Sequence, residues 1–191
     1  LVGHRDHVEV GGTVGEAPER TIVVSSVAEV EGLEVTDETK VSYLTQTTLS
    51  LDDTAEIVAA LRKRFPQIEG PAKDDICYAT QNRQNAVKAL AQEVDLVLIV
   101  GAANSSNTLR LVEVAQAAGV AAERIESAEQ VRPEWLKSLR CVGITAGASA
   151  PEDIVQGIVS KLQSLVESSA VRTLELVQED VTFALPAVLR A

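Results

Sequence analysis

The chain has 191 residues, 46% of them hydrophobic, and a formal net charge of −11 at pH 7. This length and apolar fraction suffice for a hydrophobic core, in one large domain or two small ones. The acidic balance argues against a nucleic-acid or membrane surface, because phosphate contacts need clustered Lys and Arg, and no apolar run approaches the ~20 residues of a membrane-spanning helix.

The two cysteines, Cys77 and Cys141, lie far apart in the sequence and form no CxxC pair. Lone thiols in a chain of this size indicate a reducing compartment, so we expect a cytoplasmic protein. Taken alone, each cysteine is typical of a small buried hydrophobe. The chain starts at Leu1, has no Met and shows no signal peptide, and we expect a fragment, a processed form or an engineered form.

Short apolar runs alternate with amphipathic segments along the chain. Strands rich in Val and Ile are predicted at 1–3 (the end of a strand), 21–24, 41–44, 96–100 and 141–144, with a weaker candidate at 120–125. Helices are predicted from apolar spacing at 53–65, 83–93, 108–118 and 151–166. This alternation predicts parallel sheets with right-handed crossover connections.

Gly70 and Pro71 follow the end of one predicted helix and are typical of a domain boundary. We therefore predict an α/β fold with two small parallel-sheet lobes, at 1–72 and 73–168. A C-terminal tail over 169–191 is expected to hold two extended segments, at 171–177 and 181–185.

Three predicted strands run into clusters of small polar residues, and each cluster precedes a helix. The clusters are TQTTLS (45–50), GAANSSN (101–107) and TAGASAP (145–151). Parallel sheets bind ligands beyond the carboxyl ends of their strands, where helix N-termini offer free N–H groups to anions. The three clusters together predict a phosphate or diphosphate cradle, although at any one helix start Ser, Thr and Asn are better explained as N-caps alone.

The opening segment places His7 and Glu9 just after a predicted strand end. A histidine and a carboxylate in such a position can hold an anion and move a proton. From the spacing alone, a histidine bound to a backbone carbonyl and a solvated glutamate is the simpler interpretation.

Several stretches resemble one enzyme family, the 4-hydroxy-3-methylbut-2-enyl diphosphate reductases. The motifs that carry the resemblance are TQTTLS (45–50), DDICYATQNR (74–83), NSSN (104–107) and TAGASAP (145–151), in the family's order and spacing. The opening GHRDHVEV (3–10) is similar to the family's GHxxHPEV element, with Val8 where the family usually has Pro. The resemblance runs from about residue 1 to about residue 185 and lacks the family's N-terminal third.

The resemblance implies two lobes of a three-lobed, trefoil-like α/β protein with a [4Fe–4S] cluster at its centre. Three cysteines hold that cluster, and the fourth iron is left for substrate. The implied reaction is the reductive dehydroxylation of 4-hydroxy-3-methylbut-2-enyl diphosphate to isopentenyl and dimethylallyl diphosphate. The implied electron donor is of the ferredoxin or flavodoxin type.

Individual residues match positions of the family motifs. Glu9 resembles the proton donor, and Thr47 resembles the threonine that relays the proton and meets the substrate hydroxyl. Cys77 resembles the third cluster ligand, whereas Cys141 matches no ligand position. The residues that match the diphosphate contacts are His7, Ser105, Ser106, Asn107 and Ser149.

The other two cluster cysteines lie in the family's first third and are absent here. We therefore expect that this chain alone holds no stable [4Fe–4S] cluster and is inactive by itself. Two alternatives stay open: a non-redox module that binds a phosphate or diphosphate, and a scaffold fragment without a ligand.

Overall fold

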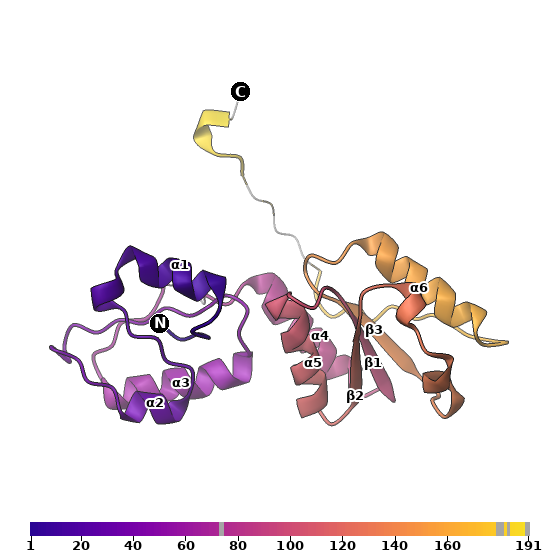
Figure 1. Ribbon diagram of the computed structural model, residues 1–191, viewed down its shortest axis with the longest axis horizontal. Coiled ribbons are helices and arrows are strands. Elements are labelled where there is room, and N and C mark those ends of the chain that lie inside the picture. Colours follow the sequence, from indigo (N-terminus) through magenta and orange to yellow (C-terminus); the bar gives the residue numbers. More distant parts are fainter. Residues whose placement is uncertain (73–74, 179–181, 183, 190–191) are drawn as a thin grey trace.

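The computed structural model describes residues 1–72, 75–178, 182 and 184–189. Figure 1 shows two groups of elements that follow one another along the chain. The first contains the helices α1 (Val8–Glu16), α2 (Val27–Glu31) and α3 (Leu51–Arg64). The second contains α4 (Tyr78–Leu90), β1 (Leu96–Val100), α5 (Ser106–Ala117), β2 (Ala121–Ile125), β3 (Val142–Ala146) and α6 (Glu152–Ser164).

Short 3₁₀ turns complete these elements. They lie at Pro18–Arg20, Ala128–Gln130, Pro133–Lys137 and Ala187–Leu189. Among the residues that the structure describes, none of the helices combines the length and the apolar character that spanning a membrane requires.

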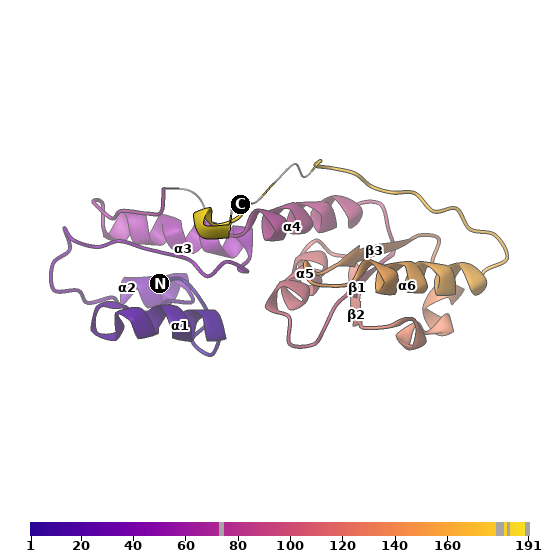
Figure 2. The same cartoon turned by 90° about the horizontal axis from the view of Figure 1, so that it is seen from above.

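The second group is built around a parallel three-stranded sheet in the order β2-β1-β3. Leu98 of the central strand pairs in register with Glu123 of β2 and Ile144 of β3. All five residues of β1 are buried, because helices cover both faces of the sheet. Val97 and Ile99 pack toward α4 and α5, and the alternate residues pack toward α6. The sheet therefore lies between these two helical layers (Figure 2).

The first group has its own core but little regular sheet. Its pairing consists of isolated parallel bridges, Val2 with Val24 and with Thr45, and Ser42 with Glu69. The predicted strands 21–24 and 41–44 are therefore paired segments too short to form strands. A separate apolar cluster, including Val2, Tyr43 and Phe65, packs them against α2 and α3.

Helix boundaries differ from the sequence prediction mainly at N-termini. α4 starts at Tyr78 rather than at 83, with Cys77 as its N-cap. α1 and α2 were not predicted, because the glycines of VEVGGTVGE disfavour a helix and α2 has only five residues. Tertiary packing of Val10 and Val30, both 1% exposed, outweighs these weak local preferences.

The predicted lobe boundary and tail lie partly outside the described residues. Residues 73 and 74, at the boundary, are among those not described, as are 181 and 183 in the second predicted tail segment. Residues 169–178 form neither helix nor strand. The division at 72/73 therefore stays a prediction.

One contact between the two groups is a buried amide. Gln84 of α4 is 0% exposed, accepts a hydrogen bond from Leu51 N–H at 3.0 Å and donates one to the Leu49 carbonyl at 2.7 Å. Close by, Lys88 of α4 forms an exposed ion pair with Asp52 of α3 at 2.7 Å. These contacts bring the polar clusters after residues 44 and 100 toward each other.

Candidate functional site

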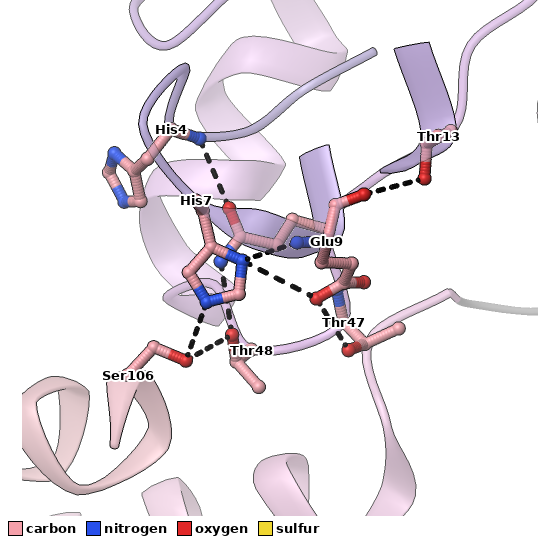
Figure 3. Close-up of polar contacts among 8 residues, drawn as sticks. His4, His7, Glu9, Thr13, Thr47, Thr48 and Ser106 are labelled. Carbon is pink, nitrogen blue, oxygen red and sulfur yellow. Dashed lines mark hydrogen bonds and ion pairs between the residues drawn. The ribbon is translucent and has the colours of Figure 1, made fainter. Parts of the chain in front are cut away.

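Glu9 and Thr47 form a hydrogen-bonded pair in the first group of elements. Glu9 lies in the first turn of α1. One carboxylate oxygen accepts the Thr47 backbone N–H at 2.8 Å, and the other accepts the Thr47 hydroxyl at 3.1 Å (Figure 3). Thr47 thus supplies both hydrogen bonds to the carboxylate, which also lies 4.0 Å from His7 Nδ1.

A pocket of about 160 Å³ lies beside this pair. Besides Glu9 and Thr47, its polar lining residues are Thr13, Thr45, Gln46 and Asp75. Asp75 accepts the Thr45 backbone N–H at 2.8 Å, while the buried Thr45 hydroxyl has no partner among the described residues. The pocket is thus lined by groups that can exchange hydrogen bonds with a small polar molecule.

His7 connects the two groups of elements. It is the N-cap of α1, where its Nδ1 accepts the Glu9 backbone N–H at 3.3 Å. Its Nε2 lies 3.2 Å from the Ser106 hydroxyl at the start of α5. Ser106 in turn lies 3.0 Å from the Thr48 hydroxyl (Figure 3). The interpretation from spacing alone, with Glu9 solvated and His7 bound to a backbone carbonyl, was therefore wrong.

The N-terminus of α5 carries a second polar feature. Ser105 is its N-cap and accepts hydrogen bonds from the Thr108 backbone N–H at 3.3 Å and hydroxyl at 3.0 Å. Asn107 is 7% exposed, and neither polar atom of its amide has a partner among the described residues. A buried amide without partners is costly, which points to a ligand that completes it.

Gly147, after β3, allows this close packing. A Cβ there would lie 2.3 Å from the Thr108 hydroxyl and 3.7 Å from the Asn107 amide nitrogen. Ser149 lies two residues further on, in the turn closed by Ala150 N–H and the Gly147 carbonyl, and is exposed. Among the described residues, no hydrogen bond joins Ser149 to the rest of the cluster.

Cys77 lies next to the Glu9–Thr47 pair. Its backbone N–H donates to the Thr47 carbonyl at 3.1 Å, and its side chain is exposed at the start of α4. Cys141 is also exposed, at the start of β3, where its backbone N–H donates to Asp95 at 3.0 Å. The interpretation of both cysteines as buried hydrophobes was therefore wrong.

The described residues do not by themselves form a complete metal centre. They contain no group of three or more His, Cys, Asp and Glu side chains that could hold a metal ion. An exposed thiol at the start of a helix is nevertheless accessible to a metal cluster of the kind that cysteines hold. Cys77 thus has the chemistry and the exposure that one ligand of a cysteine-held cluster needs.

Two residues of the site were missed by sequence reasoning. Gln46 and Thr48 belong to the cluster TQTTLS, but nothing in the sequence singled them out from their neighbours. Gln46 is 1% exposed and joins the His4 backbone N–H to the Thr48 hydroxyl. A buried glutamine within a polar run has no periodicity signal, and only the fold reveals it.

Residues 1–163 match the LytB protein family. The chain belongs to this family. The resemblance inferred from the four motifs is thereby confirmed.

Curated LytB relatives cover the whole chain. It is 52% identical over 190 residues to the 4-hydroxy-3-methylbut-2-enyl diphosphate reductase of Ralstonia nicotianae and 51% identical over 193 residues to that of Escherichia coli O9:H4. It covers 58% and 61% of those relatives, so the chain spans about three-fifths of their length.

A solved LytB-type structure confirms the α/β fold class. The E-1-hydroxy-2-methyl-but-2-enyl-4-diphosphate reductase from Plasmodium falciparum matches with a TM-score of 0.81 and 40% identity. The match covers 85% of this chain and 51% of that one.

Proposed function

We propose that this chain is the substrate-binding and proton-donating part of a 4-hydroxy-3-methylbut-2-enyl diphosphate reductase. One observation carries the proposal. His7 bridges the lobe that holds the Glu9–Thr47 pair to the α5 N-terminus, with its Nε2 3.2 Å from the Ser106 hydroxyl. This contact supports a single ligand site between the Glu9 carboxyl group and the hydrogen-bond donors at the start of α5, as a diphosphate with a reactive hydroxyl at its far end requires.

The diphosphate is assigned to the α5 N-terminus. Free N–H groups and the positive dipole end of a helix favour an anion there. The unpartnered Asn107 amide supplies a further donor, and Ser106 and His7 close the other side. Ser105 and Ser149 complete the proposed contacts, Ser149 from an exposed turn that can approach the ligand.

The substrate hydroxyl is assigned to Glu9 and Thr47. Replacing C–OH by C–H consumes two electrons and two protons and releases water, so one proton must reach the departing oxygen and one the carbon. Glu9, held by the Thr47 N–H and hydroxyl, is the proposed donor of the proton that leaves as water. Delivery of the second proton to either end of the allyl unit gives isopentenyl or dimethylallyl diphosphate.

A [4Fe–4S] cluster would supply the two electrons when bound. Cys77 is the proposed ligand in this chain, and its position beside Thr47 supports that role. Two further cysteines must come from outside the chain. A ferredoxin or flavodoxin-type donor and a cytoplasmic location belong to the same proposal.

Anaerobic reconstitution with iron and sulfide tests this proposal. We expect no stoichiometric iron on the chain alone, and about four irons once the segment present in longer relatives is supplied as a second polypeptide. Cys77→Ser should abolish that iron, whereas Cys141→Ser should not.

The alternative function is a non-redox diphosphate-binding module. The unpartnered Asn107 amide favours diphosphate binding whether or not iron is present. If the completed protein holds no iron but the chain binds inorganic pyrophosphate, the cluster assignment of Cys77 is wrong and the module is the better description.

A further inference from the structure

Gln46 is a buried amide with both ends hydrogen-bonded in a fixed direction. Its side-chain oxygen accepts the His4 backbone N–H at 3.0 Å, which orients the amide. Its nitrogen must then donate to the Thr48 hydroxyl at 3.1 Å. Turning the amide over would place its NH2 group against the His4 N–H, so the buried side chain keeps this orientation. Thr48 therefore receives a hydrogen bond from the interior.

His7 has an equally fixed direction at the other end of the same chain of contacts. An imidazole nitrogen that accepts a hydrogen bond carries no proton. Because Nδ1 accepts the Glu9 N–H at 3.3 Å, the proton of the neutral ring is on Nε2. Nε2 therefore donates to the Ser106 hydroxyl at 3.2 Å.

Two hydroxyls lie between these two donors, 3.0 Å apart. Thr48 and Ser106 carry one proton each, and one of the two protons forms the bond between them. The other has no acceptor at either end, since Gln46 and His7 both donate. Among the described residues, these two oxygens have no other hydrogen-bond partner. One hydroxyl proton is thus left over for a group that is not part of the protein cluster.

We propose that Gln46 is a positioning residue that sets the direction of this hydrogen-bond chain, so that the Thr48–Ser106 pair offers its remaining proton to a diphosphate oxygen. The inference rests on the proposed function, in which the diphosphate binds at the start of α5. Gln46 acts through Thr48 and does not itself contact the ligand.

Gln46→Glu reverses the direction of the hydrogen bond between residue 46 and Thr48, and the side chain keeps nearly the same shape. A carboxylate still accepts the His4 N–H but draws in the Thr48 proton. Ser106 then donates to Thr48, and no proton remains for the ligand. Because hydrogen bonds to charged groups are the stronger ones, we expect pyrophosphate affinity to fall roughly 10- to 100-fold.

Thr48→Val separates this effect from the added negative charge. With the link removed, the Ser106 proton is free again whatever residue is at position 46. Gln46→Glu combined with Thr48→Val is therefore expected to bind pyrophosphate more tightly than Gln46→Glu alone. A repulsive charge at position 46 would act equally in both backgrounds.

The test is titration calorimetry of the chain and its three variants with inorganic pyrophosphate, with melting temperatures measured without ligand to verify folding. Rescue by Thr48→Val supports the inference. Unchanged affinity in Gln46→Glu, or an equal loss in both backgrounds, overturns it and leaves the proposed function standing. If the unsubstituted chain binds no pyrophosphate, the proposed function fails, and the inference fails with it.

A measurement without ligand tests the direction of the hydrogen bond between His7 and Ser106. The chain has two histidines, and they are expected to be opposite tautomers. Arg110 can only donate to His4 Nε2, 3.1 Å away, which places the His4 proton on Nδ1, whereas the His7 proton is on Nε2. Long-range ¹H–¹⁵N correlation spectra at alkaline pH distinguish the tautomers. A proton on His7 Nδ1 would leave no spare hydroxyl proton and would overturn the inference.

Discussion

Glu9 receives both of its side-chain hydrogen bonds from Thr47, and this arrangement distinguishes its two oxygens. The oxygen that faces the backbone N–H can only accept. The other faces a hydroxyl, which can donate to a carboxylate or accept from a carboxylic acid. The same pair can therefore hold Glu9 before and after it gives up a proton.

Glu9→Gln tests the proton-donor role. The amide oxygen can still accept the Thr47 N–H and the amide NH2 can donate to the Thr47 hydroxyl, but the amide carries no acidic proton. In the enzyme completed with its cluster we expect kcat to fall roughly 10²- to 10⁴-fold, the usual contribution of general acid catalysis. Pyrophosphate affinity, measured by calorimetry, should change far less because Glu9 is not assigned to the diphosphate. A normal kcat would exclude Glu9 as the donor.

Asn107→Leu should raise stability and weaken ligand binding at once. The buried amide has no partner among the described residues, and such a group costs about 1–3 kcal/mol. A leucine of similar size removes that cost, so we expect the free energy of unfolding measured in urea to rise by about 1 kcal/mol. Pyrophosphate binding should weaken in the same variant. A loss of stability would show that the amide is satisfied within the fold.

The individual site residues were only partly predictable from sequence. His7, Ser106 and Asn107 follow strand ends, and the fold brings them close together. Gln46 and Thr48 were missed because their importance lies in burial and hydrogen-bond direction, which no local pattern encodes. Ser149 keeps its assignment from the motif, without a contact to the others.

Helix α1 shows how an element can form against its own composition. Gly11, Gly12 and Gly15 lie in it, and a Cβ built at any of them meets nothing within 4 Å. The helix depends on its His7 cap and on the burial of Val10. This explains why apolar spacing and propensity did not predict it.

Gly12→Ala should therefore stabilise the chain. The extra methyl group finds open space and reduces the freedom of the unfolded chain, so we expect a gain of roughly 0.5–1 kcal/mol in urea unfolding. Gly143→Ala is the matched control, since its Cβ would lie 2.7 Å from a methyl carbon of Leu90. That variant should lose stability. A loss in Gly12→Ala would mean that α1 needs its glycines.

Asp95 fixes the start of β3 and makes it sensitive to acid. Its carboxylate accepts the backbone N–H groups of Arg140 and Cys141 at 2.8 and 3.0 Å, and these bonds hold the pKa of Asp95 below its ordinary value. Its stabilising effect is thus complete above the unfolded pKa of about 4 and is lost as pH falls through the folded pKa.

Asp95→Asn should remove this pH dependence. The amide cannot accept in the same way as a carboxylate, and it does not titrate. We expect the variant to be less stable than the unsubstituted chain at neutral pH and the difference to shrink below about pH 4. Melting curves from pH 3 to 7 measure it. A constant difference across this range would contradict the assignment.

At the scale of the whole molecule, the two groups of elements are joined by unequal contacts. Gln84 is fully buried, whereas the side chains of Lys88 and Asp52 are 38% and 70% exposed. Exposed ion pairs contribute little, because water and salt screen them. The buried amide is therefore expected to contribute more to the coupling than this ion pair does.

Gln84→Leu should cost about 1–3 kcal/mol of unfolding free energy, since it leaves the Leu51 N–H and the Leu49 carbonyl without their partner. Lys88→Met should cost less than about 1 kcal/mol. Chemical denaturation of both variants compares them directly. Equal costs would mean that the surface pair matters as much as the amide.

The fold of the second group of elements was more predictable from the sequence than the fold of the first. The run LVLIV and the helices around it determine the parallel sheet, because a strand buried on both faces has few alternatives. The first lobe instead depends on bridges between distant single residues, such as Val2 and Thr45, which no periodicity reveals.

The side chain of Thr108 fills the space beside two glycines from separate loops, since a Cβ at Gly101 or at Gly147 would each lie 2.3 Å from its hydroxyl. In evolutionary terms, substitutions at these three positions are coupled. A larger residue at either glycine can become fixed only after Thr108 has been replaced by a smaller residue. That first substitution would leave a gap beside Ser105, the N-cap of α5. Among descendants of this sequence, these three positions should therefore change together or stay unchanged.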